Sequence, residues 1–545
     1  MAHGKPRLRY SMTCVMLLAV AGCGAQQAGD GPAAADGSIT TGLVEHLQAS
    51  GFRVSPGYAR LYTQQDCKNS TYPLVKNCYA NNPAAPYVMP IVKTWPNEYV
   101  DPAVVNAFGR LRPGYSGTYR LEPRDAVVVY GKMPPPARYM GLQTFEFSQN
   151  GRWKSSDRLK WERTAGQPVP LQYLFDTIPP DGGKSGRTQS VSALGDVVND
   201  VVMKRQSGYS FEKNRYFVIT PSATTDRAVR RALQAQGVAA DDIFTERIPD
   251  RDAHGPIGPL GMGRNAVDFL TTFRYAVPEP GREQAAEKWR KNPPLTVMRV
   301  RAPASVGPVQ RYGAMAFEKR TADSEAHLAG DLSTLVGAVC ERVRTAAHLN
   351  TGDCAQQARS ASTLMPDLVR DFGFTGPYCR RINMNCLGDE QDAAYFLSRP
   401  LPLDSGQVYA VVDTLATETG NATYAALSVN DPSLMAGVAN ILDDGLKGSA
   451  SSYAKTVRQA QKFFVHYFTR DCSVLRGVPG GPENCTRITT GLLPSRANTS
   501  AEGDPALHGA FMASLRDYVK PGTERGPDST KLLTPRILTF TQPAK

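Results

Sequence analysis

The spacing of the cysteines constrains the folding of this chain more than any other sequence feature. The chain has 545 residues and ten cysteines. The last eight form four couples of near neighbours, Cys67/Cys78, Cys340/Cys354, Cys379/Cys386 and Cys472/Cys485. A bridge within a couple would close a loop of about 7 to 14 residues, and a loop near 15 residues is worth roughly 3 kcal/mol in the chain-entropy model. Eight cysteines allow many pairings, so spacing alone does not select one, but the short loops favour nearest-neighbour disulfides.

The alternative uses of these cysteines are less well supported. Zinc sites usually combine Cys-x2-4-Cys with a second such couple or with a histidine pair. The tightest spacing here is Cys379-x6-Cys386, no histidine pair accompanies it, and no Cys-x-x-Cys redox motif occurs. Because disulfides persist in oxidising compartments, the disulfide interpretation requires an exported chain.

The N-terminus has the features of an export signal. Lys5, Arg7 and Arg9 make residues 1–22 basic, and these residues include no acid. A short apolar run at 12–21 follows, and it is too short to span a bilayer, which needs about 20 residues. A basic segment followed by a short apolar segment is typical of a secretory signal.

The signal ends in Val20-Ala21-Gly22-Cys23, which resembles the lipobox of bacterial lipoproteins. The resemblance covers only residues 1–23. It implies removal of a signal peptide, residues 1–22, and attachment of a diacylglyceryl group to Cys23, with further acylation by fatty acids such as palmitate. The mature protein would then be lipid-anchored at the extracytoplasmic face of the cell membrane or the outer membrane. The alternative is an ordinary signal peptide with a chance cysteine.

Composition divides the rest of the chain into a tether and a folded body. Residues 23–38 are rich in Gly, Ala and polar residues and have almost nothing to bury, so we expect a flexible tether. The body, with 41% hydrophobic and 21% charged residues over the whole chain, is that of an ordinary folded protein. We expect two intimately packed lobes, at 39–280 and 281–545.

Residue periodicity predicts a mixed architecture in the N-terminal lobe. A short helix is expected at 39–53, and strands at 125–130 and 139–147, which three prolines separate. A strand, helix and strand between 216 and 246 predict a β-α-β unit. It lacks a Gly-x-Gly-x-x-Gly between the first strand and the helix, so we interpret it as a packing unit and not as a nucleotide site. Residues 277–295 have the composition of a solvated connector.

The C-terminal lobe shows the clearest helix of the chain, between 328 and 343, where apolar residues recur at helical spacing. The other expected elements are a strand at 298–301, a helix at 355–371 interrupted by Pro366, a hairpin of 407–415 and 422–429, a strand at 462–468, and helices near 432–446 and 506–519. Strands and helices without regular alternation predict an α+β fold with mixed, largely antiparallel sheets.

Known catalytic and cofactor motifs are not matched. Gly183-Lys184-Ser185 lacks the upstream glycine of a phosphate loop, because Ile178 stands there. Ser452-Tyr-Ala-Lys455 lacks the companion strings of penicillin-recognising enzymes. The chain has no Gly-x-Ser-x-Gly elbow and no His-Glu-x-x-His helix. The sequence therefore implies no cofactor.

Several polar residues are candidates for a ligand site, although each is also explained by fold support. Asn81, Asn82 and Tyr87 follow the first cysteine couple, which would hold two amides and a phenol in place. Arg138 and Tyr139 begin a strand after the proline run. Asp268 and Arg274 lie six residues apart on one stretch, residues 268–274. Exposed aromatic and amide groups around a rigid loop suit a carbohydrate or a small amphipathic ligand.

Two further candidates have different chemistry. His466 interrupts an apolar strand, where it is either a catalytic base or a solvent-facing residue opposite inward-facing Val465 and Tyr467. Asp389 and Asp392 lie in an acidic stretch after Cys386, which suits calcium ligation through oxygen atoms or a solvated loop. The stretch lacks the twelve-residue calcium-loop pattern.

The charge of the chain limits its partners. The formal net charge is +12, and loss of the three basic residues of the signal leaves +9, which favours anionic surfaces such as lipid headgroups or envelope polymers. The sequence has no basic stripe interleaved with aromatic residues, so we expect no nucleic-acid binding. The leading hypothesis is an envelope lipoprotein that binds a ligand or partner. The alternatives are an envelope hydrolase with a non-local active site and a structural or assembly lipoprotein.

Overall fold

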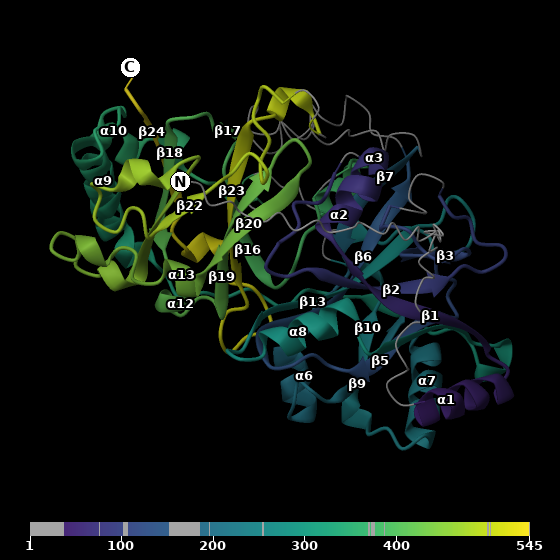
Figure 1. Ribbon diagram of the computed structural model, residues 1–545. Coiled ribbons are helices and arrows are strands. Elements are labelled where there is room, and N and C mark those ends of the chain that lie inside the picture. The colour runs from purple at the N-terminus through teal and green to yellow at the C-terminus, as the bar shows by residue number, and fades with distance from the viewer. Residues whose placement is uncertain are drawn as a thin grey trace, which may run out of the picture.

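The computed structural model describes residues 37–75, 77–101, 107–151, 186–195, 197–252, 255–368, 371, 376–385, 387–498, 501 and 503–543. Over these residues the fold is α+β with mixed, largely antiparallel sheets, as predicted. Figure 1 shows two bodies side by side, one purple to teal and the other green to yellow. The predicted lipid site, Cys23, and nearly all of the predicted tether lie outside the described residues, as do residues 1–22.

The first body is built on a twelve-stranded sheet, here called the first sheet. Its main path is β10-β9-β5-β14-β1-β2-β13-β6-β7, with three short strands at its side. The strands are β1 (Arg53–Tyr62), β2 (Tyr87–Lys93), β3 (Tyr115–Ser116), β4 (Thr118–Tyr119), β5 (Asp125–Lys132), β6 (Ala137–Asn150), β7 (Arg187–Ala193), β8 (Val198–Asn199), β9 (Asn214–Thr220), β10 (Ile243–Arg247), β13 (Asp268–Pro278) and β14 (Leu295–Arg301). β14 lies within this sheet, so the first sheet extends beyond residue 280.

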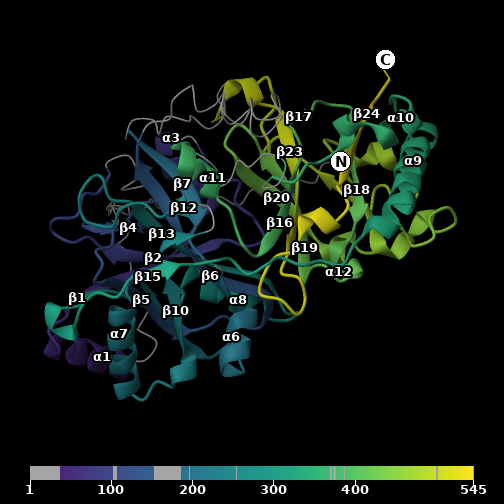
Figure 2. The same ribbon diagram turned by 180° about the vertical axis from the view of Figure 1, so that it is seen from behind.

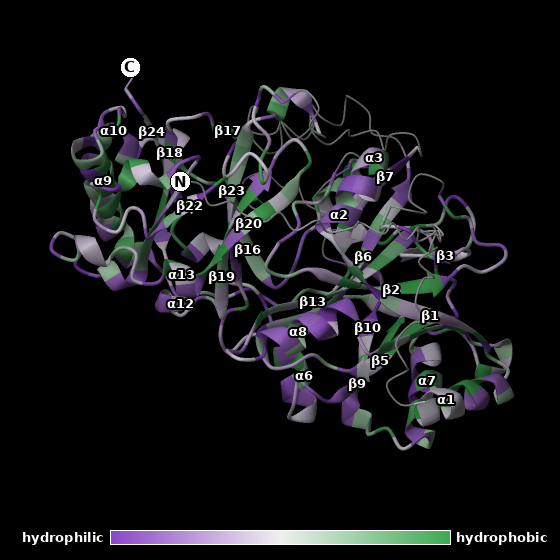
Figure 3. Cartoon of the chain, viewed as in Figure 1, coloured by the Kyte–Doolittle hydropathy of each residue, from purple (hydrophilic) through white to green (hydrophobic). Residues whose placement is uncertain are grey.

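Helices cover both faces of this sheet around β5, which explains why β5 contains an apolar run. On β5, Val127 and Val129 belong to one core cluster, whereas Ala126 and Val128 belong to another. The first cluster includes Trp289 of a surface helix, and Figure 3 shows that helix, α8, as largely hydrophilic and β2 as hydrophobic. The helices are α1 (Gly37–Ala49), α6 (Asp200–Ser207), α7 (Ala223–Ala235) and α8 (Glu283–Lys291).

Most predicted elements of this body are confirmed. The chain forms α1, β5 and β6 where periodicity predicts them, and β9, α7 and β10 form the β-α-β unit with β10 parallel to β9. The predicted connector is wrong, because residues 283–291 form α8, whose Ala286 and Trp289 are buried against the sheet. A small three-stranded sheet of β11 (Pro249–Asp252), β12 (Gly255–Pro256) and β15 (Tyr312–Ala314) and the short segments α2 (Gln64–Asp66), η1 (Cys67–Thr71) and α3 (Tyr72–Val75) complete this body.

The second body is two sheets packed face to face. The second sheet has the order β16-β23-β19-β20, with β17 beside β23, and the third sheet has the order β22-β21-β18-β24. Their strands are β16 (Ala393–Leu397), β17 (Leu401–Pro402), β18 (Gln407–Thr414), β19 (Tyr424–Asp431), β20 (Ala436–Leu442), β21 (Phe463–Thr469), β22 (Cys485–Arg487), β23 (Ala510–Tyr518) and β24 (Arg536–Thr541). One core cluster joins Val411 and Phe464 of the third sheet to Leu427 and Leu515 of the second.

The outer face of the third sheet packs against the predicted long helix, α9 (Ala329–Ala346), whose Leu335, Val336, Val339 and Val343 are buried. Figure 2 shows α9 at the side of the molecule away from the first sheet. The remaining helices of this body are α10 (Cys354–Arg359), α12 (Ala416–Thr419) and α13 (Asp443–Leu446). α11 (Gly376–Ile382) instead packs against β7 of the first sheet (Figure 2). Single 3-10 turns are η3 (Ala240–Asp242), η4 (Ala304–Val306), η5 (Ala326–Leu328), η6 (Ala361–Thr363), η7 (Ser451–Tyr453), η8 (Ala460–Lys462), η9 (Cys472–Leu475), η10 (Pro505–Leu507) and η11 (Ser529–Lys531). No helix in the described ranges is long and apolar enough to cross a membrane.

Several predictions for this body are wrong. The predicted hairpin does not form, since β18 pairs with β21 and β24 whereas β19 pairs with β20 and β23 in the other sheet. The predicted helix near 506–519 is mostly β23, in which all nine residues are buried. Residues 436–442 form β20 instead of a helix, and α10 ends at Arg359, so the predicted helix at 355–371 stops early.

Three of the predicted disulfides are confirmed. Cα–Cα distances are 5.7 Å for Cys67–Cys78, 5.5 Å for Cys340–Cys354 and 5.9 Å for Cys472–Cys485. Cys379 is also disulfide-bonded, and Cys386 lies outside the described residues. Nearest-neighbour pairing therefore holds for these three couples, and each closes a short loop.

Candidate functional site

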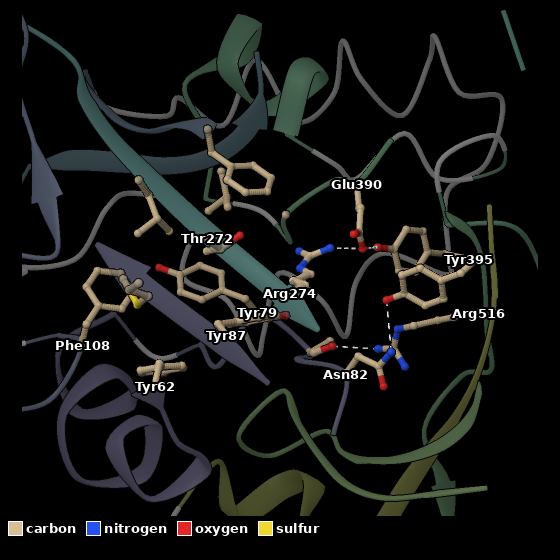
Figure 4. Close-up of a pocket in the computed structure, with 17 residues that line it drawn as sticks. Tyr62, Tyr79, Asn82, Tyr87, Phe108, Thr272, Arg274, Glu390, Tyr395 and Arg516 are labelled. Atoms are coloured by element: carbon tan, nitrogen blue, oxygen red, sulfur yellow. Dashed lines mark hydrogen bonds and ion pairs between the residues drawn. The ribbon is translucent and has the colours of Figure 1, made fainter. Parts of the chain in front are cut away.

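A cavity lies where the first sheet meets the second sheet, and Figure 4 shows the side chains around it. Side chains alternate between the two faces of a strand, so residues two positions apart line the cavity together. Leu270, Thr272 and Arg274 share one face of β13, and Arg516 and Tyr518 share the face of β23 opposite the inter-sheet core. The full lining is Tyr62, Tyr79, Ala80, Asn82, Tyr87, Met89, Phe108, Phe145, Val191, Leu270, Thr272, Arg274, Gly388, Glu390, Tyr395, Arg516 and Tyr518.

The cavity is small and has two chemically different ends. The space open to the centre of a water molecule is about 60 Å³, and one water needs about 10–15 Å³ by this measure. The cavity therefore has room for a few waters or for one small ligand group. Figure 4 shows Phe108 and Arg516 on opposite sides of Arg274, and Phe145 and Leu270 add further apolar side chains to the lining.

The first disulfide and the segment after it form one wall. Tyr79 and Ala80 follow Cys78 and have φ values of +57° and +44°. Their segment is fastened to the second body, because the Cys78 amide donates to Leu434 O at 3.0 Å and the Ala80 amide donates to Met435 O at 2.8 Å. Positive φ is sterically unfavourable for residues other than glycine. The two hydrogen bonds therefore hold Tyr79 and Ala80 in a conformation that the segment would not adopt alone.

Backbone strain recurs at a second position of the lining. Val191 of β7 lines the cavity with φ +47°, a conformation that is an outlier for a β-branched residue. It packs against Gly388, where an added Cβ would lie 3.0 Å from Val191 Cγ1. Strained residues of this kind concentrate at ligand sites, where the surrounding structure holds them in place.

Glu390 is the central anion of the cavity. It forms an ion pair with Arg274, accepts a hydrogen bond from the Tyr139 hydroxyl at 2.8 Å, and accepts another from the Tyr395 hydroxyl at 2.7 Å. Burial raises the pKa of Tyr139 and Tyr395 well above the usual value, so both phenols remain protonated donors. The Arg274 guanidinium also lies 5.0 Å from the ring centre of Tyr87, within the range of a cation–π contact.

The acidic stretch that contains Glu390 is buried, contrary to the solvated alternative. Arg320 donates to Glu390 O at 2.9 Å and to Ala393 O at 2.6 Å, and Arg525 donates to Gln391 O at 3.2 Å. Guanidinium groups from two distant segments thus hold the backbone that positions the carboxylate.

Asp389 and Asp392, the predicted calcium ligands, serve as hydrogen-bond acceptors in this buried loop. Asp389 accepts from the Ala193 amide at 2.8 Å, and Asp392 accepts from the Asn199 side-chain amide at 3.2 and 3.3 Å. Burial raises the pKa of Asp389 to about 6 and that of Asp392 to about 7. Over the described part of the chain, no group of three or more His, Cys, Asp or Glu side chains could hold a metal ion, so the geometry gives the calcium hypothesis no support.

Arg516 contributes a second positive charge. It donates to Ser514 Oγ at 2.9 Å, to Ser428 Oγ at 3.1 Å and to Ala80 O at 2.7 Å. All three acceptors are neutral. Across the described ranges, no carboxylate forms an ion pair with Arg516, in contrast to Arg274.

Three polar atoms around the cavity are buried without a hydrogen-bond partner. They are the Tyr79 hydroxyl, the Thr272 hydroxyl and Arg274 Nε. Leaving a buried polar group unpaired costs about 1–3 kcal/mol, so three such atoms around one space make that space a candidate site for a bound partner. All three residues line the same space.

The structure brings some of the sequence-predicted residues together. Asn82, Tyr87 and Arg274 line the cavity, where Asn82 Nδ2 donates to the Tyr518 hydroxyl at 3.1 Å. Tyr139 reaches the cavity indirectly, through Glu390. Asn81 lies at the edge of the site and accepts from the Gly437 amide at 3.2 Å.

Three other candidates lie outside the cavity lining. Arg138 forms ion pairs with Asp443 at 2.6 Å and Asp444 at 2.5 Å, joining the first body to the second. Asp268 is buried beside Arg120 and Arg187, at 3.3 and 3.2 Å, in the arrangement expected of fold support.

His466 is the third of these candidates, and it is buried, contrary to the expectation that it faces solvent. Val465 and Tyr467 pack inward, as predicted, in the core cluster that includes residues of α9. The opposite face of β21, which carries Phe464 and Phe468, is covered by the second sheet. His466 Nε2 lies 2.8 Å from Thr486 Oγ1, and burial lowers the pKa of the imidazole to about 4.

Sequence reasoning did not single out Tyr79, Thr272, Glu390, Tyr395 and Arg516 for the site. One usable signal was present, because Leu270, Thr272 and Arg274 alternate along residues 268–274. Arg516 had none, since its strand was predicted to be a helix.

Comparisons with known proteins add no functional information. The chain matches no protein-family model, and no curated protein is similar to it in sequence. Among solved structures, an uncharacterised protein from Burkholderia cenocepacia aligns over 92% of this chain and 87% of its own, at 8% identity and a TM-score of 0.34. A protein from Vibrio parahaemolyticus aligns over 77% and 87%, at 9% identity and a TM-score of 0.30. Both scores are too low to carry an argument about this chain.

Proposed function

We propose that this chain is a lipid-anchored protein of the extracytoplasmic side of a membrane, which binds a small ligand in the cavity between its first and second sheets. The observation that carries the binding proposal is the set of unpaired buried atoms, Tyr79 Oη, Thr272 Oγ1 and Arg274 Nε, around one cavity. A ligand would supply their missing partners.

The positive-φ residues on two walls support the same proposal. Tyr79 and Ala80 belong to one wall and Val191 to another, and strain at a cavity is consistent with a binding surface held ready for its ligand. The size of the cavity favours a small molecule or one end of a longer molecule over a whole sugar ring. The disulfides support an oxidising location, which agrees with the anchor proposed at Cys23.

The anchor is tested by labelling. Cells that express the full chain should incorporate radiolabelled palmitate into it, and Cys23→Ala should abolish the label, because the diacylglyceryl group is attached through that sulfur. The label is measured after immunoprecipitation and gel electrophoresis. Cys14→Ala is the matched control and should label as the wild type does. Equal labelling of the wild type and Cys23→Ala would remove the anchor from the proposal.

Ligand binding is tested by filling the cavity. A set of small soluble compounds of different charge is screened against the full chain in detergent by ligand-observed NMR. Thr272→Met extends a side chain into the space of about 60 Å³ and should reduce binding of any hit at least tenfold. Thr334→Met, at an exposed position of α9, is the matched control and should leave binding unchanged. Hits that bind both variants equally would place the binding elsewhere and contradict the proposal.

A further inference from the structure

The charges around the cavity do not balance. Arg274 and Glu390 form an ion pair, and Glu390 accepts from two phenols as well. Arg516 is the remaining charged side chain of the lining, and its three acceptors are a carbonyl and two hydroxyls. The lining therefore carries a net charge of one positive unit in a largely buried space, where an unopposed charge is costly.

The free donors of Arg516 match a carboxylate. A guanidinium has five N–H groups, and the three hydrogen bonds to Ser428, Ser514 and Ala80 leave two of them. A planar guanidinium edge binds the two oxygens of a carboxylate with good geometry. The unpaired hydroxyls of Tyr79 and Thr272 add donors beside the same space.

The rest of the lining favours a short apolar group. Met89, Phe108, Phe145 and Leu270 line the cavity and offer no charge and no strong hydrogen-bonding group to a ligand. A space of about 60 Å³ for water centres is too small for a long acyl chain. A carboxylate with a short apolar chain would place its charge at Arg516 and its chain among these side chains.

We infer that the cavity binds a small monocarboxylate, with the carboxylate paired to Arg516 and the apolar part against the Phe108 and Leu270 side chains. This inference rests on the proposed ligand-binding function. A cationic ligand fits less well, because Glu390 is already paired with Arg274 and two phenols. A phosphate dianion would reverse the charge imbalance and would leave the apolar wall without a partner.

A matched series of four-carbon probes tests the inference on the full chain in detergent. Butyrate, butyramide and butylamine have similar size and differ in charge. Butyrate should bind at least tenfold more tightly than butyramide, and butylamine should bind most weakly, since a hydrogen bond to a charged group is worth about 10- to 100-fold in affinity. Dissociation constants are measured by ligand-observed NMR titration.

Variants of Arg516 test whether this residue causes the preference for butyrate. Arg516→Gln should remove most of the preference for butyrate over butyramide, and Arg516→Lys should retain part of it, because the charge remains while the planar edge is lost. Arg458→Gln, at an exposed arginine, is the control and should retain the wild-type preference. The wild-type probe series decides the question even when Arg516→Gln does not fold.

The outcomes separate this inference from the function on which it rests. If butyramide or butylamine binds as tightly as butyrate, and that binding is lost in Thr272→Met, the carboxylate inference is overturned while ligand binding in the cavity stands. If none of the probes binds while a hit of the compound screen binds and is lost in Thr272→Met, the carboxylate inference is overturned and ligand binding in the cavity stands. If Thr272→Met binds the probes and the screening hits as the wild type does, both the inference and the proposed cavity function are overturned.

Discussion

Glu390→Gln is expected to lower the free energy of unfolding by about 3–5 kcal/mol, the usual cost of removing one partner from a buried ion pair. The Glu390 side chain is 1% exposed and that of Arg274 is 12% exposed, so Arg274 would keep its charge away from water without a counter-ion. The glutamine would also direct an N–H₂ group toward the hydroxyl donor of Tyr139 or Tyr395. Urea denaturation at neutral pH, followed by circular dichroism, measures the change.

A surface ion pair between the same two bodies provides the control for Glu390. Asp444 pairs with Arg138 at 2.5 Å, but its side chain is 67% exposed. Exposed pairs contribute about 0–1 kcal/mol, so Asp444→Asn should change stability little. A double variant, Glu390→Gln with Arg274→Met, should recover part of the loss, because the unpaired charge is gone. Equal effects of Glu390→Gln and Asp444→Asn would show that the buried pair is not a principal contact between the sheets.

Asp392→Asn is expected to make the protein more stable than the wild type at pH 8, by on the order of 4 kcal/mol, and equally stable near pH 4. Burial raises the pKa of Asp392 from 3.8 in the unfolded chain to about 7. Between these values the folded protein retains a proton that the unfolded chain has lost. The contribution of this group is therefore complete below about pH 4 and is lost as the pH rises through 7, whereas asparagine has no proton to lose.

Urea denaturation of the wild type and of Asp392→Asn at several pH values between 4 and 8 measures this effect. The comparison between the two proteins isolates Asp392 from His466, whose lowered pKa acts in the opposite direction by destabilising the fold as the pH falls below about 6.5. Asp241→Asn, at an exposed position, should follow the wild-type curve, since that side chain is in water in both states. Parallel curves for the wild type and Asp392→Asn would contradict the prediction.

Local sequence signals predicted the parts of the fold that local interactions decide. The helical spacing between 328 and 343 predicted α9, and the strand–helix–strand pattern predicted β9, α7 and β10. These predictions hold because the apolar face of an amphipathic helix packs against the core, so its spacing in the sequence marks the helix. Cys67–Cys78, Cys340–Cys354 and Cys472–Cys485 were likewise predicted, since a short loop brings its own ends together. The failure at 506–519 occurs at β23, which is covered on both faces so that no alternation marks it. At 407–429 the predicted strands form, but they pair in different sheets instead of with each other.

The candidate site was predicted only in part, because its residues come from distant segments. Tyr87 was found because it follows the first cysteine couple, and Arg274 because it lies six residues after Asp268 on one stretch. Glu390 was expected in a solvated loop, and Arg516 was hidden in an expected helix. Neither Arg320 nor Arg525, which hold the backbone around Glu390, is close to it in sequence. Their roles follow from contacts that no local pattern encodes.

By itself the sequence determined the α+β class, the long helix and three short disulfide loops, because each depends on residues near one another in the chain. Only the tertiary structure decided that Asn82, Arg274, Glu390 and Arg516 share one cavity, since they come from four segments that the packing of two sheets brings together. It also decided their chemistry. In water, a carboxylate or guanidinium has its usual pKa and no fixed partner. Burial shifts that pKa, and packing determines which group the charge pairs with.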